Sequence, residues 1–264
     1  MTVAGRARAR SSAVCTSEPL TPGQPRPADL IPADLGPADL ILVGHGSRDP
    51  DAGVVLRRLR DAVAARLTRV RVVLAWIELD TPLLSDVIGQ PSEHPPVVIP
   101  LLLARGTHLA RDLPAHATSP LGPDPKLTAM LLDRLRDAGI ARGRPLVLAA
   151  AGSADPLGTL DVSRQAQMLE NAWGAPVRAG FVTSEPSLTA AAHEAESAAG
   201  LTPGQAGSPA HSAAAIASYF LAPGKLPSTA RPDTEHLGSH PELVELVLLR
   251  YWAAAPDGVT RLGL

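Results

Sequence analysis

The chain has 264 residues, which suits one large domain or two of ordinary size. Apolar residues make up 45% of it and charged residues 19%, so the chain can bury a core and is not broadly disordered. Its formal net charge is −2 at pH 7, and no cluster of Lys and Arg lies in the part expected to fold, which argues against nucleic acid as a partner.

The single cysteine, Cys15, excludes an internal disulfide and any Cys-rich zinc or iron–sulfur site. One cysteine also fits a reducing compartment. No apolar run reaches the roughly 18 residues of a membrane span, and the Arg-rich N-terminus lacks the apolar stretch of a secretion signal. We therefore expect a cytoplasmic protein with no membrane partner.

Residues 1–37 form an Ala- and Pro-rich segment that we expect to be disordered. The tetrapeptide PADL occurs three times, at 27–30, 32–35 and 37–40. Proline at every fifth position prevents a regular helix. Only the last copy continues into apolar sequence, so the fold should begin near Ala38.

The first predicted elements are a strand and a helix. Residues 38–47, ADLILVGHGS, are typical of a buried strand that ends in a glycine-rich turn. Residues 51–67 have the apolar spacing of a helix that buries one face. The stripe on that face consists of Val55, Leu59, Val63 and Leu67.

The next elements repeat this alternation. Residues 70–79, rich in β-branched side chains, predict a second strand, and 81–88 a short helix with Thr81 as N-cap and Pro82 in its first turn. Further along the chain we expect a strand at 95–104, a helix at 124–139 that ends at Gly139, and a strand at 144–153.

Strands that alternate with helices predict an α/β fold with a parallel sheet covered by helices on both faces. Right-handed crossovers place the carboxyl ends of such strands along one edge of the sheet. His45, Glu78 and the segment 104–108 all follow strand ends. They should therefore converge on one cleft.

The two halves of the chain resemble each other, which indicates an internal duplication. Four segments match in the same order: ILVGHGSRDP with VLAAAGSADP, TPLL with EPSL, LARGTHL with LAPGKLP, and LGPDPKLTAMLLDRL with LGSHPELVELVLLRY. The last match aligns His240 with Asp124, which suggests that His240 starts a helix. We expect an N-terminal lobe at 38–142, a C-terminal lobe at 143–256 with a degenerate site, and a tail at 257–264.

Three polar residues occur in the first half only. In the alignment His45 corresponds to Ala151, His108 to roughly Leu226, and Glu78 to Val182. A histidine pair with a purely structural role would be expected in both copies. The first lobe is therefore the candidate chemical lobe, and the second is a wall of the cleft.

The motif GHGSRDP places His45 at a strand-to-helix turn. Gly44 and Gly46 allow a tight turn and close approach of the backbone, and Ser47 can cap the helix that follows. Arg48 lies beside them. A turn histidine that bonds its own backbone remains an alternative at this position.

The motif RGTHL places Arg105, Gly106 and His108 after another strand. A solvent-facing loop histidine is the alternative here. Neutral imidazoles are good ligands for Fe²⁺, Co²⁺, Ni²⁺ or Zn²⁺, and Glu78 can add a carboxylate. Two histidines and one carboxylate with open positions form a pattern for a labile divalent metal, which can be passed on.

GHGSRDP, WIELDTP, VVIPLLLARGTHLARDLP and LGPDPKL together resemble the sirohydrochlorin chelatases, the cobalt and iron chelatases of cobalamin and sirohaem synthesis. The resemblance covers about 38–256 and is weakest at 181–226. It implies two similar α/β lobes with the tetrapyrrole between them, no organic cofactor, and Co²⁺ or Fe²⁺ as a substrate. It also implies that His45 and His108 bind the metal and accept pyrrole protons, with Glu78 assisting.

Sirohydrochlorin carries eight carboxylates, so basic groups are needed at the rim of the cleft. Arg48, Arg105 and Arg111 are the candidates, and Arg105 stands where relatives usually have a bulky residue. A histidine phosphatase is disfavoured because Gly44, and not Arg, precedes His45. An α/β-hydrolase is disfavoured because GHGSR lacks the nucleophile elbow.

A metal or tetrapyrrole carrier that binds without inserting would use the same residues and remains open. The choice between cobalt and iron also remains open. Because the duplicated chain supplies both lobes, we expect a monomer.

Overall fold

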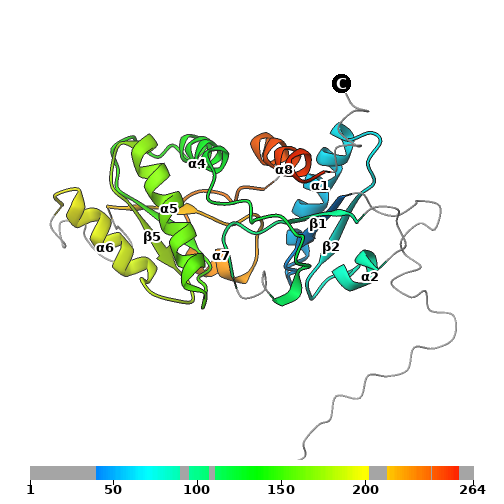
Figure 1. The fold of residues 1–264 in the computed structure, drawn as a ribbon. Coiled ribbons are helices and arrows are strands. Elements are labelled where there is room, and N and C mark those ends of the chain that lie inside the picture. Colours follow the sequence, from blue (N-terminus) through cyan, green and yellow to red (C-terminus); the bar gives the residue numbers. More distant parts are fainter. Residues whose placement is uncertain (1–39, 90–94, 107–110, 202–212, 239, 256–264) are drawn as a thin grey trace, which may run out of the picture.

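The computed structural model describes residues 40–89, 95–106, 111–201, 213–238 and 240–255, in which two α/β lobes lie side by side (Figure 1). The first sheet is parallel in the order β2-β1-β3. Its strands are β1 (Leu40–Gly44), β2 (Val72–Trp76) and β3 (Val97–Pro100), and its helices include α1 (Pro50–Arg66) and α2 (Leu84–Ile88).

The second sheet repeats this topology in the order β5-β4-β6. Its strands are β4 (Leu146–Ala150), β5 (Val177–Phe181) and β6 (Ala215–Ser218), and its helices include α5 (Pro156–Trp173), α6 (Leu188–Ala198) and α7 (Lys225–Ala230). The central strands β1 and β4 are buried along their whole length, as expected for a parallel sheet covered on both faces. The predicted fold class and the two similar lobes are thereby confirmed.

The last helix of each half packs across the boundary between the lobes. Helix α4 (Pro125–Asp137) follows the first sheet in sequence but contacts α5 and β6, whereas α8 (Pro241–Ala254) contacts α1 and β3. Figure 1 shows α4 beside α5 and α8 beside α1. The boundary at 142 between the two sequence repeats stays a prediction, and in space each lobe includes a helix from the other half of the chain.

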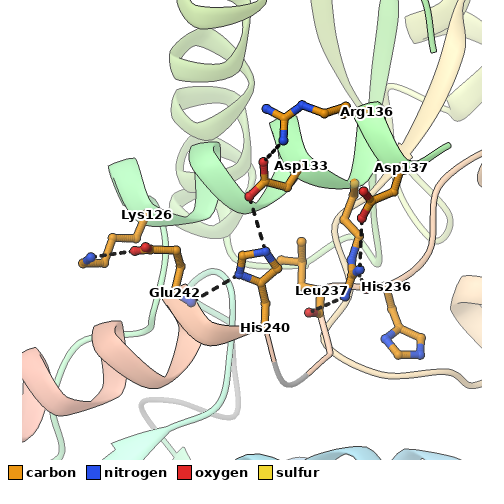
Figure 2. A network of polar contacts seen from close by, with 9 residues as sticks. Lys126, Asp133, Arg136, Asp137, His236, Leu237, His240 and Glu242 are labelled. Carbon is orange, nitrogen blue, oxygen red and sulfur yellow. Dashed lines mark hydrogen bonds and ion pairs between the residues drawn. The ribbon is translucent and has the colours of Figure 1, made fainter. Parts of the chain in front are cut away.

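Helices α4 and α8 also contact each other through polar side chains (Figure 2). Lys126 Nζ lies 2.7 Å from Glu242 Oε2. His240 is the N-cap of α8, because its Nδ1 accepts a hydrogen bond from the backbone N–H of Glu242. Its Nε2 lies 3.5 Å from Asp133 Oδ2. The predicted role of His240 is therefore confirmed, and Asp124 caps α4 in the same way.

Two predicted caps were wrong. Ser47 does not cap α1, because Asp49 is the N-cap and accepts from Asp51 N–H, while the Ser47 hydroxyl accepts from Asp49 N–H. The short helix α2 begins at Leu84, not near Thr81, and the Thr81–Pro82 peptide bond is cis. Pro82 instead lies in the turn before α2, where its carbonyl accepts a hydrogen bond from the backbone N–H of Trp76 in β2.

Most of the predicted helical stripe of α1 is buried. Leu59 and Val63 are fully enclosed, and Leu67 follows the helix as a buried residue, whereas Leu56 replaces Val55 on the buried face. The segments 1–37 and 257–264, predicted as a disordered N-terminus and a tail, lie outside the described residues. Within the described ranges, every helix is too short or too polar to cross a bilayer.

Candidate functional site

His45 and Glu78 lie side by side at the carboxyl ends of the neighbouring strands β1 and β2. Glu78 N–H donates a hydrogen bond of 3.0 Å to the His45 carbonyl, which continues the pairing of the two strands by one residue. The His45 Nδ1 atom lies 3.6 Å from Glu78 Oε1, and the two side chains are 40% and 49% exposed. An imidazole and a carboxylate are thus presented together to an incoming ligand.

The two glycines around His45 are required by close contacts. A Cβ atom on Gly44 would lie 2.6 Å from the ring of Trp76. Gly46 has a φ of 101°, and a Cβ there would collide with the carbonyl of Glu78. These glycines therefore allow the turn that holds His45 next to Glu78. Any effect they have on ligand binding is indirect, through the shape of this turn.

Ser47 and Arg48 follow in the same turn. Besides its bond with Asp49, the Ser47 hydroxyl approaches Gly224 of the second lobe, 3.5 Å from where a Cβ on that glycine would lie. Ser153, which corresponds to Ser47, approaches Gly106 in the same way. The two lobes therefore meet through a reciprocal serine–glycine contact. Arg48 is exposed at the turn.

Arg105 is bound by the second lobe and does not point freely to a ligand. Its backbone N–H and its Nε each donate to Asp161 Oδ2, at 3.0 and 2.8 Å, and its Nη2 donates to Oδ1. Burial alone would raise the pKa of Asp161, but Arg105 outweighs it and holds this pKa below its ordinary value. The idea that Arg105 meets a substrate carboxylate is therefore disfavoured, because its Nε and Nη2 already donate to Asp161.

The backbone before Arg105 is held by a second contact with the same lobe. The hydroxyl of Tyr219 donates a hydrogen bond of 3.0 Å to the carbonyl of Leu103. The Arg105 carbonyl packs so closely on Gly158 of α5 that a Cβ there would collide with it. The segment that leaves β3 is therefore fixed by the lobe that lacks His45 and Glu78.

His108 lies outside the described residues, so its position relative to His45 stays a prediction. Gly106, the last described residue before it, lies beside Ser153. Among the residues that are described, no three His, Cys, Asp or Glu side chains gather closely enough to hold a metal. The described part of the site is thus the pair of His45 and Glu78.

The predicted counterpart of Glu78 in the second lobe was wrong. Glu78 N–H bonds the His45 carbonyl, and Thr183 N–H bonds the Ala151 carbonyl, so Glu78 corresponds to Thr183 and not to Val182. The reason is one extra residue in the first lobe between Glu78 and Pro82, compared with Thr183 and Pro186. The second lobe retains a hydroxyl here, which donates to the Ala151 carbonyl.

An open pocket of about 670 Å³ lies next to the pair. Its apolar lining comes from Ile77, Leu84, Ile88 and Leu113, and Glu78 lies on its wall. Arg111, one of the predicted rim residues, also lines it. The pocket therefore combines apolar surface with one cation, Arg111, and two carboxylates, Glu78 and Asp112.

Comparisons with known proteins show which proteins the chain is similar to. Residues 39–138 match the CbiX family. A sirohydrochlorin cobaltochelatase of Methanopyrus kandleri is 24% identical over 136 residues, which cover 38% of this chain and 95% of the relative. One of Methanocaldococcus jannaschii is 33% identical over 78 residues, covering 28% of this chain and 54% of the relative.

Two solved structures share the fold. SirB from Bacillus subtilis with Fe³⁺ has a TM-score of 0.67 and 21% identity, and the match covers 87% of this chain and 99% of SirB. The sirohydrochlorin chelatase SirB from Bacillus subtilis subspecies spizizenii, in complex with cobalt, has a TM-score of 0.64 and 21% identity, with coverage of 85% and 98%. The family match and the sequence relatives confirm the resemblance stated from the sequence, and the solved structures confirm the fold.

Proposed function

We propose that this chain, whose residues 39–138 match the CbiX family and whose two lobes share the fold of SirB, inserts Co²⁺ or Fe²⁺ into sirohydrochlorin. The observation that carries the proposal is the placement of His45 Nδ1 3.6 Å from Glu78 Oε1 at one sheet edge. The relatives that match in sequence are named sirohydrochlorin cobaltochelatases, and the CbiX match at residues 39–138 includes both residues.

Metal insertion requires a ligand for the incoming cation and a base for the ring protons, and the pair of His45 and Glu78 can supply both. The two inner N–H protons of the ring must leave as the cation enters, so a base is needed at the ring face. A neutral imidazole can accept such a proton or bind the cation, and a nearby carboxylate stabilises either positive charge. We assign these roles to His45 and Glu78, and we propose His108 as the second imidazole.

An exposed pair suits a metal that is a substrate. A structural site encloses its metal with a full set of protein ligands, whereas a site that hands on its metal must keep positions open. Both side chains of the pair are about half exposed. The metal can therefore be reached by the pyrrole nitrogens of a ring above the sheet edge.

The carboxylates at the edge of the ring need basic side chains that do not already pair with an acidic residue of the protein. Arg48 is exposed beside His45, and Arg111 lines the pocket that contains Glu78. Arg105 is less suited to this role, because its Nε and Nη2 already donate to Asp161. We propose Arg48 and Arg111 as carboxylate contacts at the rim.

We further propose that the protein acts as a monomer in the cytoplasm. The support is that one chain supplies both lobes, with α4 and α8 each packed across the boundary, and that its single cysteine fits a reducing compartment. Light scattering that gives the mass of a stable dimer would contradict the first part.

The experiment is anaerobic incubation of the purified protein with sirohydrochlorin and Co²⁺ or Fe²⁺, followed by absorbance. A chelatase gives many turnovers per protein molecule, above the spontaneous rate. A carrier binds metal or ring in stoichiometric amounts and stops, which would contradict the proposal. The ratio of the cobalt rate to the iron rate then indicates which metal the protein favours.

A further inference from the structure

Leu79, the residue after Glu78, has an unusual backbone conformation. Its φ is 65°, and among the described residues it shares a positive φ with only one other non-glycine residue, Arg231. The backbone N–H of Asp80 donates a hydrogen bond of 2.8 Å to the carbonyl of Glu78, so Leu79 is the central residue of a three-residue γ-turn. A γ-turn with positive φ is rare and strained for a side chain that branches like leucine.

The second lobe builds the same crossing without this turn. Its chain from Thr183 to Pro186 is one residue shorter than the chain from Glu78 to Pro82, and Ser184, which follows Thr183, has no positive φ. Both versions still connect a strand to a helix through a cis proline. The extra residue and its strain are therefore not needed for the connection itself.

The strained turn is part of the architecture of the His45–Glu78 pair. The Glu78 carbonyl that accepts the γ-turn bond is the group that lies against Gly46. The Leu79 Cβ lies next to the same glycine, 3.3 Å from where a Cβ on it would be. The Cβ atom of Leu79 therefore lies next to the turn that carries His45, and Leu79 directly follows Glu78, which carries the carboxylate.

The side chain of Leu79 is 53% exposed. An exposed leucine alone means little, because folded proteins expose much apolar surface. Here, however, a strained backbone holds it next to the candidate metal ligands, and strained conformations persist mainly where function maintains them. A flat macrocycle whose centre lies over His45 and Glu78 would offer its apolar face to this side chain.

We infer that Leu79 is a binding contact for the macrocycle, packing on the face of the ring that is presented to His45 and Glu78. This inference rests on the proposed function. In this inference Leu79 binds the ring, while His45 and Glu78 bind the metal and accept the protons.

The test compares Leu79→Ala, Leu79→Gly and Leu79→Met in metal insertion and in direct binding of metal-free sirohydrochlorin, followed by absorbance. Removing the side chain should raise KM and the Kd of the ring roughly tenfold, with kcat much less affected. Met should preserve most of the binding. Leu79→Gly should lose binding although its Tm is at least that of the wild type, because glycine relieves the positive φ.

Leu249→Ala is the matched control, because Leu249 is 54% exposed on α8 and lies outside the site. It should leave KM and the ring Kd unchanged. An unchanged ring Kd and KM in Leu79→Ala would overturn the inference while leaving the proposed function intact. A wild type that binds the ring without turnover would overturn the proposed function, and the ring Kd values would still decide the role of Leu79.

Discussion

Asp161 of α5 binds Arg105 of the opposite lobe through both carboxylate oxygens, and it also accepts the backbone N–H of the same arginine. The Asp161 side chain is only 3% exposed, whereas the Arg105 side chain is 33% exposed, so the carboxylate of this contact between the lobes is enclosed. The lobe that lacks the candidate ligands therefore fixes the chain that leads from β3 toward His108 in the sequence. The second lobe therefore helps to position the chain next to the site and does not only line the cleft.

Replacing Asp161 by Ala should lower Tm by several degrees, because Arg105 would keep a guanidinium and a backbone N–H without their partner. Thermal unfolding followed by circular dichroism measures the effect. Asp61→Ala is the control, because Asp61 pairs with Arg60 at the surface and such pairs contribute little. Equal Tm values for the two variants would contradict the importance of the interlobe pair.

The stability that Asp161 provides should depend on pH in one direction. Its pKa is lowered in the folded state, so its contribution is complete above the unfolded pKa and is lost as pH falls through the folded value. The difference in unfolding free energy between wild type and Asp161→Asn should be constant from pH 7 to about 5 and shrink below about pH 4. Urea unfolding at these pH values tests this, and a difference that grows on acidification would contradict it.

Gly46→Ala should be more disruptive than an ordinary glycine substitution. Gly139 has a φ of 68° with open space around it, so Gly139→Ala measures the cost of the positive φ alone, about 1 kcal/mol. Gly46→Ala adds a collision with the Glu78 carbonyl. We expect Gly46→Ala to lose more unfolding free energy than Gly139→Ala. We expect a loss of activity in Gly46→Ala and none in Gly139→Ala. Similar losses in both variants would mean that the His45 turn can relax.

His240→Ala should destabilise the protein by about 1 kcal/mol, because the first turn of α8 loses its N-cap. His240→Asn should restore most of the stability, since its side chain can accept the same Glu242 N–H bond. Chemical denaturation gives both values. If Asn were no better than Ala, the contribution of His240 would come from its contact with Asp133 and not from capping.

The sequence predicted the strands β1 to β4 and the helices α1 and α4 because each has a plain apolar pattern, whereas most of the second lobe was expected only through its resemblance to the first. It also predicted, through the repeat, that His240 starts a helix. The exchange of α4 and α8 between the lobes could not be predicted, because helical periodicity shows which face is buried but not against which sheet. The counterpart of Glu78 was misassigned because one extra residue shifts the alignment after it.

The role of Asp161 was missed although the sequence carried a signal for it. On α5 the positions 158, 161, 165 and 169 follow one helical face, and two of them hold Asp161 and Gln165. Both are buried. Polar residues on an otherwise apolar stripe predict buried polar contacts. The partner, Arg105, could not be named without the packing of the two lobes.

The central claim is that His45 and Glu78 carry the chemistry, with His108 as the second imidazole. The most direct measurement is the rate of cobalt insertion into sirohydrochlorin by His45→Ala, Glu78→Gln and His108→Ala, each with a Tm to confirm folding. His193→Ala, which changes an exposed histidine of α6, is the control. We predict that His45→Ala and His108→Ala reduce kcat/KM at least a hundredfold, that Glu78→Gln reduces it about tenfold, and that the control has wild-type activity. Wild-type turnover in a folded His45→Ala protein would contradict the account.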